Sequence, residues 1–129
     1  MGKLEKIKDI IVYKEQNSYN TFPNIIQLEN KDLMVSFRNA PEWQYRFGDV
    51  THCDPASKGV FVTSNDGGNT WTDKLSIIYD DFFYGVQDPC LNYLSDGTIV
   101  ASFFMWKVWE EKDYPGDPSR LHKMFDRYC

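Results

Sequence analysis

Apolar and polar positions in this chain fall into short runs separated by polar turns, a pattern that predicts strands and no helix before residue 107. Two stretches carry it most clearly: PNIIQLENKDLMVSFRNA from Pro23 to Ala40, and PCLNYLSDGTIVASFFMW from Pro89 to Trp106. In each, an apolar run leads to a polar turn and then to a second aliphatic run. Both predict a β-hairpin, and Asp96-Gly97 is a strong turn signal.

The two hairpins repeat each other at an offset of 66 positions (89 − 23), without a gap. Identical residues then meet at four places: Pro23 with Pro89, Leu28 with Leu94, Ser36 with Ser102 and Phe37 with Phe103. A supersecondary unit repeated at such a period favours a propeller, and chance similarity between two hairpins is the alternative.

Two further strands lie between the hairpins, GVFVTS at Gly59–Ser64 and LSIIY at Leu75–Tyr79. Together with the first hairpin they predict a four-stranded antiparallel sheet, one blade over about 20–80. The second hairpin, about 86–106, begins the next blade. We therefore expect an all-β fold with about one and a half blades in residues 1–129.

The tail, 107–129, is charged and interrupted by Pro115, Gly116 and Pro118. Here we predict a short helix over Ser119–Arg127, with the Ser119 hydroxyl as its N-cap.

The loop SNDGGNTW, between the third and fourth strands, contains residues that can form a turn whose polar groups hydrogen-bond to one another. Ser64 and Asp66 oxygens accept the loop's own amide protons, as in Asx and ST turns. Gly67 and Gly68 allow positive φ, and Trp71 folds under the turn to bury a large apolar surface. None of these roles needs a substrate, so we predict a structural loop.

The spacing Ser64-x-Asp66-x-Gly68-x-x-Trp71 resembles the Asp-box, or BNR repeat, of sialidases (neuraminidases) and related six-bladed β-propellers. The resemblance covers roughly residues 20–106 and implies that the Asp-box is structural and distant from the active site. It implies an exo-α-sialidase-like glycosidase acting on the terminal sugars of glycans, with carbohydrate as partner and neither cofactor nor metal.

Sialidases carry a Phe-Arg-Ile-Pro motif whose arginine clamps the sugar carboxylate. This chain reads Asn20-Thr21-Phe22-Pro23, so Thr21 stands at the arginine position. Arg38, at the end of the second strand, resembles another sugar-facing arginine, because a guanidinium fork matches a carboxylate. A plain surface cation is the alternative for Arg38.

The resemblance also implies an acid/base aspartate on the loop before the Asp-box. Asp54 lies ten residues before Ser64 and is our candidate, with His52 orienting or assisting it. The alternative for Asp54 is an Asx-turn residue before Pro55. A metal site at His52-Cys53-Asp54 is disfavoured, because adjacent side chains on a strand point apart.

At the start of the second hairpin, Gln87 and Asp88 precede a proline, as sugar-binding residues often do in the family. Trp106 and Trp109 are candidates for stacking on a sugar face. For both tryptophans, packing in the core or between blades is the alternative.

Composition and charge argue against nucleic acid and anionic membranes as partners. The chain is 42% hydrophobic and 16% aromatic, with net charge −5, so it is globular and lacks the basic stripe that nucleic acid or an anionic membrane requires. The first residues contain no apolar run long enough for a signal peptide, and the three cysteines fit a reducing compartment, which predicts a cytoplasmic protein.

Thr21 weakens the case for sialic-acid hydrolysis, and the family's tyrosine nucleophile, its glutamate and two further arginines have no match here. The second hypothesis is therefore a non-catalytic propeller that binds glycan or protein. Open blade edges also predict self-association.

Overall fold

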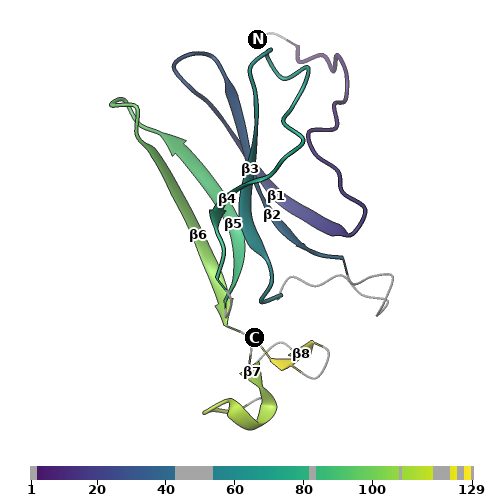
Figure 1. The fold of residues 1–129 in the computed structure, drawn as a ribbon, viewed down its shortest axis with the longest axis vertical. Coiled ribbons are helices and arrows are strands. Elements are labelled where there is room, and N and C mark those ends of the chain that lie inside the picture. Colours follow the sequence, from purple (N-terminus) through teal and green to yellow (C-terminus); the bar gives the residue numbers. More distant parts are fainter. Residues whose placement is uncertain are drawn as a thin grey trace.

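The computed structural model describes residues 3–42, 54–81, 84–107, 109–117, 123–124 and 127–128. Within them the fold is all-β: four antiparallel strands form one sheet in the order β1-β2-β3-β4 (Figure 1). Their bounds are β1 Ser18–Gln27, β2 Leu33–Pro41, β3 Lys58–Ser64 and β4 Ser76–Tyr79. The predicted antiparallel four-stranded sheet is confirmed, and both strands of the first hairpin extend beyond the predicted limits.

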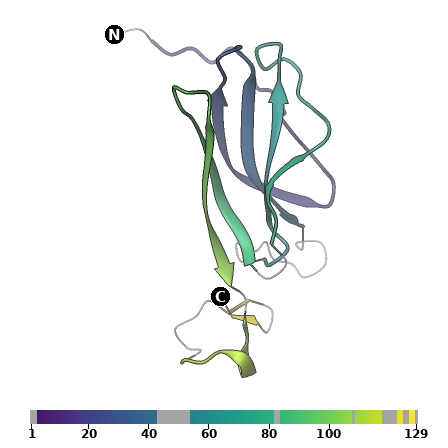
Figure 2. The same ribbon diagram turned by 60° about the vertical axis from the view of Figure 1, so that its left-hand side comes forward.

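The second hairpin comprises β5 Tyr84–Tyr93 and β6 Ile99–Lys107, and it stands beside the four-stranded sheet (Figure 2). Among the described residues, its two strands pair with each other and with no strand of that sheet. No helix in the described part of the chain is long and apolar enough to cross a membrane.

The C-terminal tail forms a small sheet in the order β7-β9-β8 rather than the predicted helix. Its strands are β7 Trp109–Glu110, β8 Lys123–Met124 and β9 Arg127–Tyr128, and a 3-10 turn, η1, occupies Glu111–Asp113. The helix predicted over Ser119–Arg127 is wrong where the structure describes it, because β9 pairs with both β7 and β8. Ladder pairing with distant residues overrides a weak local preference. Ser119 lies outside the described residues.

The two hairpins repeat each other pair by pair. Every partner pair of β1 and β2 has its counterpart in β5 and β6 at the same offset of 66, from Ser18↔Pro41 and Tyr84↔Lys107 onward. Each hairpin carries one bulge at the same place, just before and at its proline. The residue before each proline has positive φ, +56° at Phe22 and +47° at Asp88.

The turns also match. Lys31 and Gly97 occupy the same position with φ of +72° and +87°. The amide of Lys31 donates to the Leu28 carbonyl at 3.0 Å, and the amide of Gly97 donates to the Leu94 carbonyl at 3.0 Å. Glycine suits this left-handed conformation, whereas lysine adopts it at a steric cost. The repeat read from the sequence is therefore a repeat of backbone geometry.

The main core lies on one face of the four-stranded sheet. Val35 and Phe37 of β2 pair with Val62 and Val60 of β3, and all four side chains are buried. Residues from outside the sheet cover them: Val12, Tyr13, Trp71 and Leu75. Paired residues on adjacent strands share a face, which is why alternate positions of β2 and β3 form one apolar layer.

The opposite face of that sheet is covered by β5 of the second hairpin. Two side chains reach across to the β5 backbone: Asn24 Oδ1 accepts from the Leu91 amide at 2.8 Å, and Ser36 Oγ donates to the Pro89 carbonyl at 2.5 Å. Leu91 is only 3% exposed and Pro89 is fully buried. The two sheets therefore pack face to face, joined by a polar clamp at Asn24 and Ser36.

Candidate functional site

The loop at Ser64–Trp71, which resembles an Asp-box, is a self-contained turn, as predicted. Ser64 Oγ donates to Asp66 Oδ1 at 2.8 Å and accepts from the Gly68 amide at 2.9 Å. The hydroxyl and amide of Thr70 donate to the Asp66 carboxylate at 2.6 and 2.9 Å. Trp71 Nε1 donates to the Gly68 carbonyl at 3.1 Å. The Thr70 hydroxyl and amide, followed by the Ser64 hydroxyl, hold the pKa of Asp66 well below its ordinary 3.8.

The Asp-box and the predicted sugar-binding residues lie at opposite ends of the sheet. Ser64, the first residue of the box, pairs with Leu33 at the start of β2. Arg38 pairs with Gly59 at the start of β3, five residues further along β2. Asp66 is therefore far from Arg38 along the strands and belongs to the scaffold.

Arg38 is the centre of the candidate site, and it is fully buried rather than a surface cation. Burial lowers the pKa of Arg38 below its ordinary value, and electrostatic interaction with the nearby Asp54, Tyr19 and Asp88, Asp54 foremost, acts in the opposite direction. The Tyr19 ring lies beneath the guanidinium, 5.8 Å from its centroid to Cζ. The fold thus brings together Arg38, Asp54 and Asp88, three residues predicted from widely separated parts of the sequence.

Asp54 occupies an Asx turn, the structural role that its place before Pro55 also predicts. Its Oδ1 accepts from the Ala56 amide at 2.8 Å, and its carbonyl accepts from the Ser57 amide at 3.1 Å. Asp54 is 4% exposed. The turn holds the carboxylate in place beside Arg38, and a positioned carboxylate is what either a catalytic or an electrostatic role requires.

The same turn is attached to the second hairpin. Ser57 Oγ donates to the Val86 carbonyl at 2.9 Å, and the Val86 amide donates to the Ser57 carbonyl at 3.0 Å. A Cβ at Gly85 would overlap the Asp54 carbonyl oxygen. Glycine is thus required here for close approach of two backbones.

Asp88 and Thr21 lie beside Arg38, and each has one buried oxygen atom that makes no hydrogen bond to the described part of the chain. Asp88 sits at the bulge of β5 with positive φ, and its Oδ1 is buried without a hydrogen-bond partner there. Thr21 pairs directly with Arg38, and its Oγ1 is likewise buried without a described partner. Buried polar atoms usually find a partner, and exceptions often mark sites of function.

Of the other predicted sugar-binding residues, Gln87 is buried, whereas Trp106 lies on the outward face of the second hairpin. Gln87 is 2% exposed and precedes Asp88 in β5. Trp106 lies on the same face of β6 as Phe104, with the two rings edge-to-face at 5.7 Å. The other face of β6 carries Phe103, which packs on Tyr79 of β4 at 5.1 Å. Trp106 therefore faces away from the first sheet and from Arg38.

The Trp109 ring packs against neighbouring side chains near the C-terminal tail. Lys107 Nζ lies 3.7 Å from its ring centroid, and the Tyr114 ring meets it edge-to-face at 5.8 Å. Packing thus accounts for Trp109. His52, the predicted assistant of Asp54, lies outside the described residues.

Sequence reasoning missed Tyr19, Ser57 and Gly85, which support Arg38 and Asp54. The only available signal was the run Asp54-Pro-Ala-Ser57, whose spacing suits a turn closed by the serine. Tyr19 and Gly85 carry no local signal, because their roles depend on which strand lies opposite.

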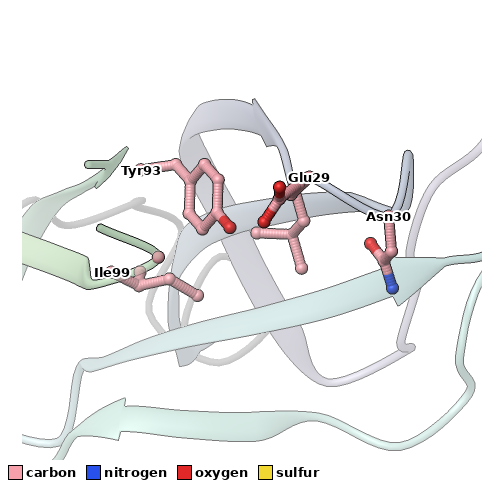
Figure 3. Close-up of a pocket in the computed structure, with 6 residues that line it drawn as sticks. Glu29, Asn30, Tyr93 and Ile99 are labelled. Carbon is pink, nitrogen blue, oxygen red and sulfur yellow. The ribbon is translucent and has the colours of Figure 1, made fainter. Parts of the chain in front are cut away.

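A groove of about 460 Å³ lies at the far end, between the two hairpin turns. The first turn contributes Leu28, Glu29 and Asn30, and the second contributes Tyr93, Gly97 and Ile99. Glu29 and Tyr93 face each other across it (Figure 3). The groove is the space between the two hairpin turns, and it does not include Arg38, Asp54 or Asp88.

Comparison with known proteins gives a fold neighbour and no function. No family model matches the chain, and no curated protein matches it. A crystal structure of a protein of unknown function from Dyadobacter fermentans DSM 18053 is similar, with a TM-score of 0.80 and 32% identity. The match covers 96% of this chain and 34% of that protein, so the chain spans about a third of its neighbour's length.

Proposed function

We propose that this chain forms one and a half blades of a sialidase-like β-propeller that binds terminal sugars of glycans at the end of the sheet carrying Arg38. Three features support the propeller: the repeated hairpin, the face-to-face packing of β5 on the first sheet, and the Asp-box between β3 and β4. Successive blades of a propeller pack in this way around a central axis.

The observation that carries the sugar site is the grouping of Asp54 and Asp88 around Arg38, at the end opposite the Asp-box. Carboxylates that are fixed in position bind sugar hydroxyls as hydrogen-bond acceptors. Asp88 is suited to this role, because its buried Oδ1 is not used by any described neighbour.

Arg38 acts in this proposal as a positioning residue. Because its side chain is fully buried, it fixes Asp54 and Asp88 by charge and does not itself lie on the surface. Thr21, its direct partner on β1, stands where the family carries an arginine. The loss of that arginine favours neutral or other acidic sugars over sialic acid.

A hydrolytic role assigns Asp54 as general acid/base. Sialidases are exceptions to the two-carboxylate rule and use a tyrosine nucleophile. That tyrosine and its glutamate have no match in this sequence, so the 129-residue chain alone should bind and not hydrolyse.

The second candidate function, a non-catalytic binding propeller, is favoured by the role of Asp54 in its own turn. Its Oδ1 is engaged by the Ala56 amide and the residue is 4% exposed, as in a structural Asx turn. In that case the same surface binds glycan without cleaving it.

The test measures binding of the chain to a panel of acidic and neutral glycans, followed by calorimetry on the strongest ligand. Asp54→Asn and Asp88→Asn keep the side-chain shape and remove one charge each. We expect each to weaken binding about tenfold, or about 1.4 kcal/mol. Asp96→Asn, in the distant turn of the second hairpin, is the matched control and should change nothing.

Binding to no glycan of the panel, or binding that both variants leave intact, would contradict the proposed site. Hydrolysis distinguishes the two functions. A longer protein that contains this chain should cleave a fluorogenic sugar and lose that activity with Asp54→Asn if the enzyme hypothesis holds. Glycan binding without turnover supports the second candidate.

A further inference from the structure

One face of the second hairpin points away from the first sheet and is exposed. The equivalent face of the first hairpin is covered. At the offset of 66, the counterparts of Met34, Ser36 and Arg38 are Val100, Ser102 and Phe104. The first three are at most 8% exposed, because β5 covers them. Val100 and Phe104 are 42% and 48% exposed, and Ser102 is exposed as well.

The strand that would cover this face also has a counterpart on the surface. In the internal interface the covering strand is β5, whose Pro89 and Leu91 are buried against the first sheet. Their counterparts on β1 are Pro23 and Ile25, and both are exposed, Ile25 by 58%. Val12 and Tyr13 cover the neighbouring β2 residues. They also line one hollow with Pro23, so the N-terminal segment borders this strip on one side, whereas Pro23 and Ile25 themselves stay exposed.

Both halves of the internal interface are therefore present a second time on the outside of the molecule. We propose that copies of this chain associate head to tail, with β1 of one copy packed on the outward face of β5 and β6 of the next. The face on one copy is formed by Cys90, Val100, Ser102 and Phe104, and the strip on the other by Pro23 and Ile25. This inference rests on the repeated hairpin and is independent of any sugar binding.

The polar clamp of the internal interface is retained in part. Ser36 Oγ donates to the Pro89 carbonyl, and Ser102 has the same position relative to the Pro23 carbonyl of an incoming copy. The other half of the clamp, Asn24 Oδ1 to the Leu91 amide, is lost because Cys90 stands at the position of Asn24. The contact between copies is thus weaker than the contact within one chain.

The occupant is a second copy because its surface provides the matching shape and backbone groups. The uncovered face carries aliphatic and aromatic side chains and one hydroxyl, and β1 brings an aliphatic residue and a carbonyl in the spacing that β5 uses internally. Such a contact joins two different surfaces, so it produces chains or rings rather than a symmetric dimer.

The experiment measures the mass of the full 129-residue chain by sedimentation over a range of concentrations. We expect species larger than the 15.1 kDa monomer, increasing at concentrations of about 10–100 µM, the range of a weak specific contact. Ile25→Asp removes the strip, and Val100→Asp removes the face. Each variant alone should remain monomeric over that range.

Mixing the two variants gives the decisive result. Ile25→Asp keeps an intact face and Val100→Asp keeps an intact strip, so the mixture should form a 1:1 dimer and stop there. Leu4→Asp, which changes a fully exposed apolar residue outside both surfaces, is the matched control and should associate like the unmodified chain.

Circular dichroism of each variant separates loss of contact from loss of fold, and the mixed dimer requires both variants to be folded. The proposal is overturned by a monomeric unmodified chain across the range. Variants that associate as strongly as the unmodified chain, or a folded mixture that stays monomeric, would overturn it equally.

Discussion

The hairpins β1–β2 and β5–β6 have the same backbone and opposite surroundings. Their pairing registers, bulges and turns coincide at an offset of 66 residues. One face of the first hairpin is covered by β5, whereas the same face of the second is open, with Phe104 48% exposed where Arg38 is fully buried. Local sequence fixes the hairpin geometry, and the neighbouring sheet decides which positions become core.

The largest change in the free energy of unfolding is expected at Gly85, where the backbone of the second hairpin touches the backbone of the Asp54 turn. Gly85 lies against the Asp54 carbonyl, whereas its counterpart in the first hairpin is Tyr19. Gly85→Val should lower the free energy of unfolding by about 3 kcal/mol, because a side chain there must displace backbone. Urea denaturation measures this. Asn92→Ala, exposed on the same strand, should change it by no more than about 0.5 kcal/mol. Equal effects would show that the turn is not tightly packed on β5.

The next comparison is between equivalent aliphatic residues. Leu91 is 3% exposed and Ile25 is 58% exposed. Leu91→Ala should cost about 2–3 kcal/mol of stability, because it removes buried methylene groups and leaves a cavity. Ile25→Ala should cost less than about 1 kcal/mol when unfolding is measured at low protein concentration. Similar costs would contradict the assignment of a covered and an open strand.

The polar clamp offers a smaller effect. Ser36 donates to the Pro89 carbonyl, whereas its counterpart Ser102 is exposed. Ser36→Ala should destabilise the fold by about 1–2 kcal/mol, because a buried carbonyl loses its donor. Ser102→Ala should leave the dilute monomer unchanged. Thermal unfolding of the pair gives the difference, and a Ser36→Ala variant as stable as Ser102→Ala would exclude a contribution from the clamp.

The smallest effect concerns the Asp-box. The pKa of Asp66 is depressed in the folded chain, so its stabilisation is present above the unfolded value of 3.8 and is lost as pH falls below it. The melting temperature should therefore decline from about pH 5 to about pH 2, and Asp66→Asn should make that decline shallower. Asp96→Asn, in the second hairpin turn, should shift the profile in the same direction, because the pKa of Asp96 is lowered as well. Asp73→Asn, at an exposed carboxylate outside the loop, is the control and should leave the decline unchanged. An Asp66→Asn variant with the unmodified pH profile would contradict the role of the carboxylate.

The sequence predicted the hairpins, the four-stranded sheet and the self-bonded loop at Ser64–Trp71 because each depends on residues close together in the chain. Alternation, Asp96-Gly97 and the Ser64-to-Trp71 spacing act through local hydrogen bonds and turns. The helix predicted at Ser119–Arg127 failed for the opposite reason, since β9 pairs with β7 across the tail. Only the family resemblance assigned Arg38, Asp54 and Asp88 to one site, and no local pattern indicated that Arg38 would be buried there.

By itself the sequence determined where the chain turns and which positions alternate, because turn residues and side-chain periodicity act over a few residues. Tertiary structure alone decided that Arg38 is buried among carboxylates, that Gly85 must lack a side chain, and that Phe104 stays exposed. Those outcomes depend on which sheet lies opposite each strand, and two hairpins with one template therefore ended in different environments.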